Sequence, residues 1–229
     1  MRTLPLALAA LAVLLAGPAR AAPPPIYVAL GDSTAVGVGA ERGGGYPERL
    51  AQRLAAAGTP VRFVNLGVSG ATAEDLRKVQ VPRAVGESPA LVTVGIGIND
   101  LVRGRPLADF ARDLEIAADA IARTKAAVVV SELPDLSHAP ASSVPPSTMA
   151  RRIAAFNATL RRVAERHGFA VAEVEAPTRR AFATRPELFA PDGFHPSARG
   201  YELWSDTLWP TVERVIAPRV QARRGAAAH

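Results

Sequence analysis

The chain has 229 residues, 48% of them hydrophobic, which is enough apolar material for one sizeable folded unit. It contains no cysteine, and this excludes disulfides, thiolate nucleophiles and cysteine metal sites. The formal net charge of +6 comes mainly from arginines scattered along the chain, not from one basic block, and therefore does not indicate nucleic-acid binding.

Residues 1–21 are typical of a secretory signal peptide. Arg2 supplies the positive start, Leu4–Ala16 is a continuous apolar stretch, and Ala19-Arg20-Ala21 matches a small-x-small cleavage site. The apolar stretch is shorter than the ~20 residues that a membrane-spanning helix needs. No cysteine follows it to carry a lipid anchor. We therefore predict export, to the periplasm or the medium, with cleavage before Ala22.

After the leader, short apolar runs of strand length alternate with segments of helical spacing. We expect strands at Ile26–Leu30, Val61–Leu66, Leu91–Ile96, Ala126–Val130 and Phe169–Val174. Helices are expected at Pro47–Ala57, after a cap at Thr72, and at Leu107–Thr124, Thr148–His167 and Ser197–Ile216. This alternation predicts one parallel sheet with helices on both faces, in a domain spanning residues 22–217.

Three segments fall outside these regular elements. Pro134–Ser147 is a proline-rich loop, long enough to be either a lid or wall for substrate or a plain surface insertion. Pro177–Pro191 is expected to be irregular, and residues 218–229 are expected to form a flexible tail.

Small polar residues follow several of the predicted strands. Gly31-Asp32-Ser33 ends the first strand, Gly70 follows the second and Asn99 follows the third. The carboxyl ends of parallel strands lie along one edge of a sheet, where open α/β sheets bind ligands. Gly37 and Gly39 keep the loop after Ser33 free of bulk.

A hydroxyl, an imidazole and a carboxylate are the groups that acyl transfer needs. Ser33 is the candidate nucleophile, and Asp192 lies three residues before His195, so that one turn can bring the carboxylate to the ring. The backbone N–H groups of Ser33 and Gly70, with the side-chain amide of Asn99, are candidates for an oxyanion hole. Taken singly, each residue could equally be a helix cap or a turn former.

The ordered set resembles the SGNH (GDSL-like) hydrolase family. The family's first block is similar to Gly31-Asp32-Ser33, its second to Gly70, its third to Gly97-Ile98-Asn99-Asp100, and its fifth to Asp192–His195. Thr34 departs from the leucine of the family name, at a position outside the mechanism. Together the blocks cover nearly the whole chain after the leader.

The resemblance implies a three-layer α/β/α, flavodoxin-like fold with a parallel five-stranded sheet. It implies hydrolysis of esters or thioesters through an acyl-enzyme, with no metal or cofactor, in the manner of small bacterial esterases and lysophospholipases. It also makes Ser33, Asp192 and His195 catalytic, and Ser33, Gly70 and Asn99 the oxyanion hole. Asp32 and Asp100 take supporting roles.

Other readings of the sequence remain open. A carbohydrate O-acetylesterase acting on envelope polysaccharide is the alternative within hydrolases, and a secreted binding module without activity is the alternative outside them. The chain lacks Gly-x-Ser-x-Gly, a phosphate loop and His-Glu-x-x-His, which disfavours α/β-hydrolase, NTPase and zinc-protease functions. The expected partner is a small-molecule, lipid or glycan ester, without nucleic acid or stable membrane insertion, and a monomer is the default.

Overall fold

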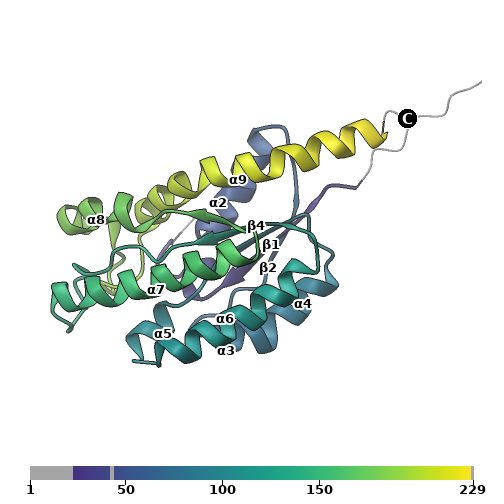
Figure 1. The fold of residues 1–229 in the computed structure, drawn as a ribbon. Coiled ribbons are helices and arrows are strands. Elements are labelled where there is room, and N and C mark those ends of the chain that lie inside the picture. The colour runs from purple at the N-terminus through teal and green to yellow at the C-terminus, as the bar shows by residue number, and fades with distance from the viewer. Residues whose placement is uncertain (1–22, 42–43, 228–229) are drawn as a thin grey trace, which may run out of the picture.

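The computed structural model describes residues 23–41 and 44–227, and its centre is a parallel sheet of five strands in the order β2-β1-β3-β4-β5 (Figure 1). The strands are β1 (Ile26–Gly31), β2 (Arg62–Asn65), β3 (Leu91–Gly95), β4 (Ala127–Ser131) and β5 (Ala170–Ala172). The chain moves outward from β1 to β2 and then crosses back to β3 on the other side of β1. The carboxyl ends of β1 and β3 therefore meet at a topological switch point, the usual place for a ligand site in such sheets.

Helices cover both faces of the sheet, as the sequence predicts. On one face α2 (Tyr46–Ala56) packs against α9 (Ala198–Ala227), and on the other α6 (Leu107–Ala122) lies between α4 (Val81–Gly86) and α7 (Pro146–Arg166) (Figure 1). Six further elements complete the helical structure of the described residues: α1 (Ser33–Val36), α3 (Ala73–Asp75), the π-helical turn η1 (Leu76–Gln80), α5 (Ile98–Val102), α8 (Glu175–Thr184) and the 3₁₀ turn η2 (Pro186–Leu188). The expected three-layer α/β/α class with five parallel strands is confirmed.

The core lies where the helices meet the central strands. Strands β3 and β4 are buried at every position, because a parallel sheet covered on both faces leaves neither side to water. Between α2 and α9, the rings of Tyr46 and Trp204 stack at 5.2 Å. The edge strand β2 is half-exposed and shorter than its apolar run suggested, since it has a hydrogen-bonding neighbour on one side only.

The structure differs from the sequence expectation in two C-terminal segments. The expectation that Pro177–Pro191 is irregular is wrong, because α8 runs through Pro177 to Thr184 and η2 follows it. Pro177 lies in the first turn of α8, where its missing N–H has no intrahelical partner to lose. The last helix, expected to end at Ile216, continues to Ala227.

Candidate active site

Ser33, His195 and Asp192 form a continuous hydrogen-bonded series at the carboxyl end of the sheet. Ser33 begins α1 directly after β1, whereas Asp192 and His195 come from the loop before α9. The Ser33 hydroxyl lies 2.9 Å from His195 Nε2, and His195 Nδ1 lies 2.6 Å from Asp192 Oδ2. Because an ionised carboxylate can only accept, Nδ1 carries the ring proton and Nε2 is left to accept from Ser33.

Asp192 is held by its own loop as well as by the imidazole. Its Oδ1 accepts the backbone N–H groups of Phe194 and His195, each at 2.9 Å, while Oδ2 faces the ring. Partial burial raises the pKa of Asp192, but the hydrogen bonds from the His195 ring and from these two N–H groups outweigh it and hold the pKa below its usual value. The carboxylate is therefore ionised at neutral pH and fixed in its orientation toward the ring.

Gly39 allows the loop that carries His195 to approach the loop that follows Ser33. A Cβ at Gly39 would lie 2.7 Å from the Pro196 carbonyl oxygen and 3.1 Å from the His195 Cβ, and the residue has φ +88°. A larger residue would push the imidazole away from Ser33 and would also be strained in this backbone conformation. The absence of bulk in this loop, which the sequence indicated, is thus a condition for the contact between Ser33 and His195.

Gly70 and Asn99 lie at the neighbouring strand ends. Gly70 has φ +82°, and its N–H, like that of Ser33, donates no hydrogen bond to any other described residue. The Asn99 amide nitrogen donates one hydrogen bond, at 3.0 Å, to the carbonyl of Ala71, next to Gly70. Because an amide nitrogen carries two hydrogens, Asn99 keeps a second donor. The three predicted oxyanion donors are thus free to bind an acceptor.

Asp100, in α5 beside Asn99, links this helix to the segment that follows Gly70. Its fully buried carboxylate accepts the Ala73 N–H at 3.0 Å through one oxygen and Arg105 at 2.8 Å through the other. Burial raises its pKa despite these hydrogen bonds. The supporting role that the family resemblance implied for Asp100 corresponds in the structure to this bridge between α5 and the start of α3.

Asp32 caps the short helix that begins with Ser33. Its Oδ1 accepts the Thr34 N–H at 2.9 Å and the Thr34 hydroxyl at 2.8 Å. Its Oδ2 is buried and accepts no hydrogen bond from the described residues. Burial raises the pKa of Asp32 to about 6, against the lowering effect of the Thr34 hydrogen bonds. The carboxylate of Asp32 is therefore charged at neutral pH at a cost in stability.

Asp32→Asn should remove the free-energy cost of a buried charged carboxylate, while the side-chain oxygen continues to cap α1. An acid whose pKa is raised on folding loses stability as the pH rises from its unfolded pKa to its folded pKa, here from near 4 to about 6. The free energy of unfolding of the variant, relative to wild type, should thus rise by about 2 kcal/mol between pH 4 and pH 8. Urea unfolding of both proteins at both pH values measures this difference in the free energy of unfolding. A difference that does not change with pH would contradict the prediction.

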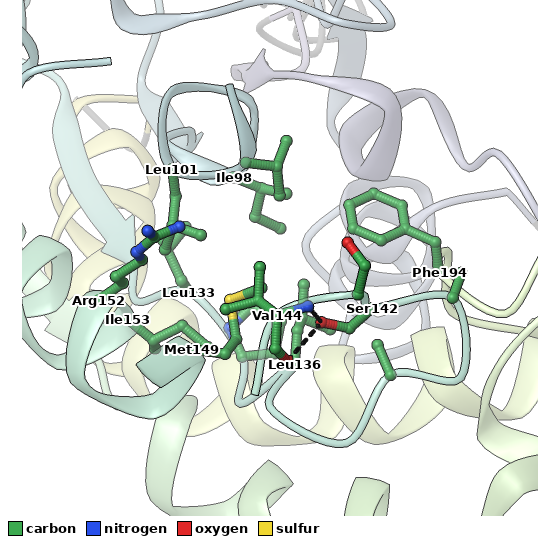
Figure 2. A pocket seen from close by; sticks show the side chains of 15 residues that line it. Ile98, Leu101, Leu133, Leu136, Ser142, Val144, Met149, Arg152, Ile153 and Phe194 are labelled. Carbon is green, nitrogen blue, oxygen red and sulfur yellow. Dashed lines mark hydrogen bonds between the residues drawn. The ribbon is translucent and has the colours of Figure 1, made fainter. Parts of the chain in front are cut away.

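A cavity of about 190 Å³ is lined in part by Phe194 and Ile98, the residues that precede His195 and Asn99. Figure 2 shows that its walls come from α5, from the loop between β4 and α7, from α7, and from Phe194, which precedes His195. The wall is predominantly apolar, with Ile98, Leu101, Leu133, Leu136, Val144, Met149, Ile153 and Phe194 among its side chains. The proline-rich loop that the sequence left as either a wall or a surface insertion forms one side of this cavity.

The sequence analysis did not single out two residues that help to build the site. Phe194 lies inside the Asp192–His195 motif, and its ring meets the His195 ring edge-on, with the ring centres 5.2 Å apart. Tyr201 on α9 donates its hydroxyl to the Val38 carbonyl at 2.8 Å and so anchors the loop after α1. Motif spacing could have suggested Phe194, but no local signal in the sequence pairs Tyr201 with a residue so distant along the chain.

Comparisons with known proteins agree with this geometry. A model of the GDSL-like lipase/acylhydrolase family matches residues 29–203. Esterase TesA of Pseudomonas aeruginosa is 26% identical over 188 residues, which are 82% of this chain and 87% of TesA. The crystal structure of TesA covers 83% of this chain and 99% of its own, with a TM-score of 0.71 and 25% identity.

Other solved structures share the fold. LAE5, an α/β hydrolase enzyme from a Lake Arreo metagenome, matches with a TM-score of 0.69 and 25% identity, over 84% of this chain and 96% of its own. The acetylxylan esterase Axe2 from Geobacillus stearothermophilus has the same TM-score with 20% identity, over 85% of this chain and 94% of its own. At that identity Axe2 supports the fold alone. Since the family model spans most of the sequence, including all the motifs above, the chain belongs to the GDSL-like lipase/acylhydrolase family and is a carboxylic ester hydrolase.

Proposed function

We propose that the protein cleaves carboxylic esters or thioesters through an acyl-enzyme on Ser33. The observation that carries the proposal is the series Ser33–His195–Asp192, with contacts of 2.9 and 2.6 Å. As Ser33 Oγ attacks the acyl carbon, His195 Nε2 takes the hydroxyl proton, and it then delivers that proton to the departing alkoxide or thiolate. Water, deprotonated by the same nitrogen, attacks the acyl carbon; that nitrogen then returns the proton to Ser33 Oγ as the carboxylic acid leaves.

The N–H groups of Ser33 and Gly70 and the amide of Asn99 stabilise the oxyanion in both steps. Their free hydrogens support this role, because none of them has an acceptor among the residues that the structure describes. Such donors accelerate the reaction because they bind the charged tetrahedral intermediate more strongly than the neutral ester.

Asn99→Ala should therefore lower kcat by about 10²- to 10³-fold and change KM much less. Asn99→Asp should be at least as poor, because it sets a negative charge beside the developing oxyanion. The melting temperature of Asn99→Ala should fall only slightly, since a single hydrogen bond to Ala71 is lost. Steady-state kinetics and calorimetry measure these two effects. A wild-type kcat, or a variant that does not fold, would contradict the assignment of Asn99 to the oxyanion hole.

The cavity beside the site supports an acyl chain longer than acetyl as the preferred substrate group. Binding of an acyl chain against its apolar wall would become more favourable by roughly 0.8 kcal/mol for each methylene taken out of water. This favours an esterase, lysophospholipase or thioesterase activity. The second candidate is a carbohydrate O-acetylesterase, suggested by the fold that the chain shares with acetylxylan esterase Axe2.

A series of p-nitrophenyl esters from acetyl to palmitoyl distinguishes these candidates. We expect kcat/KM to rise from acetyl to medium chains and then to level off or fall when the cavity is full. Val144→Trp, which narrows the cavity, should reduce activity on the longer esters and spare the acetyl ester. If the acetyl ester is the best substrate and Val144→Trp does not change its hydrolysis, the result favours the acetylesterase. If the protein does not react with a fluorophosphonate probe, the result favours a binding module without activity.

We also propose that the protein is exported, on the sequence features of residues 1–21. These residues lie outside those that the structure describes. Within residues 23–41 and 44–227, no helix is long and apolar enough to cross a membrane. N-terminal sequencing of the secreted protein should begin at or near Ala22, and a mature protein that starts at Met1 would contradict the proposal.

A further inference from the structure

A buried glutamine holds the backbone two residues before Ser33. Gln80 is 1% exposed, and its carboxamide grips both polar groups of Gly31, the last residue of β1. Gln80 Nε2 donates to the Gly31 carbonyl at 2.8 Å, and the Gly31 N–H donates to Gln80 Oε1 at 2.9 Å. This pair of hydrogen bonds joins positions 49 residues apart in the chain.

The edge of the sheet explains why Gly31 needs this partner. Strand β2 ends at Asn65, and beyond it the Leu66 N–H donates to the Ala29 carbonyl and the Val68 N–H to the Gly31 carbonyl. The Gly31 N–H points to the same side as its carbonyl, where the departing chain offers it no carbonyl oxygen. Because a buried N–H without an acceptor is costly, the Gln80 carboxamide takes the place of the missing strand.

Local backbone geometry brings Gln80 to this place. It is the last residue of a π-helical turn, η1 (Leu76–Gln80), between α3 and α4, closed by a hydrogen bond from the Val81 N–H to the Leu76 carbonyl. Such a turn is rare, is often found at functional sites, and holds one residue more than an α-helical turn, which changes the direction of the side chains that follow. The same helical segment starts at the Thr72 cap, two residues after Gly70.

We propose that Gln80 is a positioning residue that fixes the end of β1, and with it Ser33, relative to His195 and Gly70. The inference rests on the proposed role of Ser33 as the nucleophile. Two opposed hydrogen bonds, on the side of Gly31 that β2 leaves uncovered, restrain Gly31 against shifting along the strand. A displacement of Ser33 by about 1 Å is enough to lower the rate of attack about 100-fold, because nucleophilic attack requires close alignment of the reacting atoms.

The first test replaces Gln80 by methionine, which has a similar shape but forms neither hydrogen bond. We expect kcat on a neutral p-nitrophenyl ester to fall about 10- to 100-fold, with KM changed less than about twofold. Val163→Ala is the control for general destabilisation, because Val163 is a buried residue of α7 that packs near Phe169, just before β5, and does not line the cavity beside Phe194. It should lower the melting temperature and leave kcat near wild type.

A second variant keeps the test decisive if Gln80→Met does not fold. Gln80→Glu retains the acceptor for the Gly31 N–H but, when ionised, lacks the donor for the Gly31 carbonyl. Burial favours the protonated form of such a carboxyl group, which can donate. The ratio of variant to wild-type kcat should therefore rise as the pH is lowered. A purely structural role predicts a ratio near one at any pH at which both proteins are folded.

Phosphonylation by a fluorophosphonate separates failure of this inference from failure of the proposed function. In wild type the adduct should map to Ser33, and the second-order rate constant of labelling should fall in the Gln80 variants in parallel with kcat. An adduct on another residue would overturn the proposed function. An adduct on Ser33 with unchanged labelling rate and kcat in both Gln80 variants, or an equal loss of kcat in Val163→Ala, would overturn the positioning role alone.

Discussion

Ser33→Ala should lower kcat by about 10⁴-fold or more and leave the fold intact. The change removes the atom that we propose attacks the ester, and no other hydroxyl is hydrogen-bonded to His195 among the described residues. The backbone conformation of α1 should not change, because the cap of this helix is formed by Asp32 and Thr34 and not by the Ser33 side chain. The kcat of purified protein on a p-nitrophenyl ester, with its melting temperature, measures both effects.

Two other serines provide matched controls for this prediction. Ser69→Ala should keep near wild-type kcat, because Ser69 is exposed and forms no hydrogen bond through its side chain to the described residues. Ser131 is fully buried, donates to the Glu132 carbonyl and accepts the Trp204 ring N–H, so its loss should affect stability and little else. Loss of activity in Ser69→Ala or Ser131→Ala, with Ser33→Ala active, would show that the nucleophile is another hydroxyl.

His195→Ala should be about as damaging as Ser33→Ala, and Asp192→Asn should cost about 10²- to 10⁴-fold in kcat. In the asparagine variant the side-chain oxygen stays with the N–H groups of Phe194 and His195, so the new NH₂ group faces the ring. The NH₂ group donates to His195 Nδ1, so the ring proton moves to Nε2, which can no longer accept the proton of Ser33. The Asp192 side chain is 46% exposed, so water can restore part of the correct tautomer.

A double variant and a remote histidine test this assignment. Residues that act as one unit are not additive, so Ser33→Ala combined with His195→Ala should be little worse than either change alone. His167→Gln is the control, because His167 contacts Glu115 near the amino end of β5, remote from Ser33. A wild-type kcat in Asp192→Asn would contradict the proposed role of Asp192. Fully additive losses of kcat in the double variant would contradict the proposal that Ser33 and His195 act together.

Much of this protein follows from patterns that are local in the sequence. Apolar runs of strand length locate all five strands to within a few residues, because a buried strand must be apolar along its whole length when helices cover both faces. Their alternation with helical segments predicts a parallel sheet, because such connections require a helix between consecutive strands. The four ordered motifs around Ser33, Gly70, Asn99 and His195 then identify the family.

Other features depend on packing that no local pattern contains. The sequence missed α8, because Pro177 alone suggests a helix breaker until its place in the first turn is known. The cavity beside Phe194 is built by four segments distant in the sequence, so neither its size nor its apolar wall could be derived from any one of them. The π-helical turn that brings Gln80 to Gly31 is likewise invisible, because its residues read as an ordinary amphipathic helix.

The sequence by itself therefore determined the layers of the fold, the family and the residue types available for catalysis. Only the tertiary structure decided which of these groups meet, since the hydroxyl of Ser33 and the ring of His195 are 162 residues apart and touch because Gly39 leaves room between their loops. The physical reason is that hydrophobic periodicity is a short-range property of the chain, whereas a hydrogen bond at 2.9 Å depends on the packing of every element between its partners.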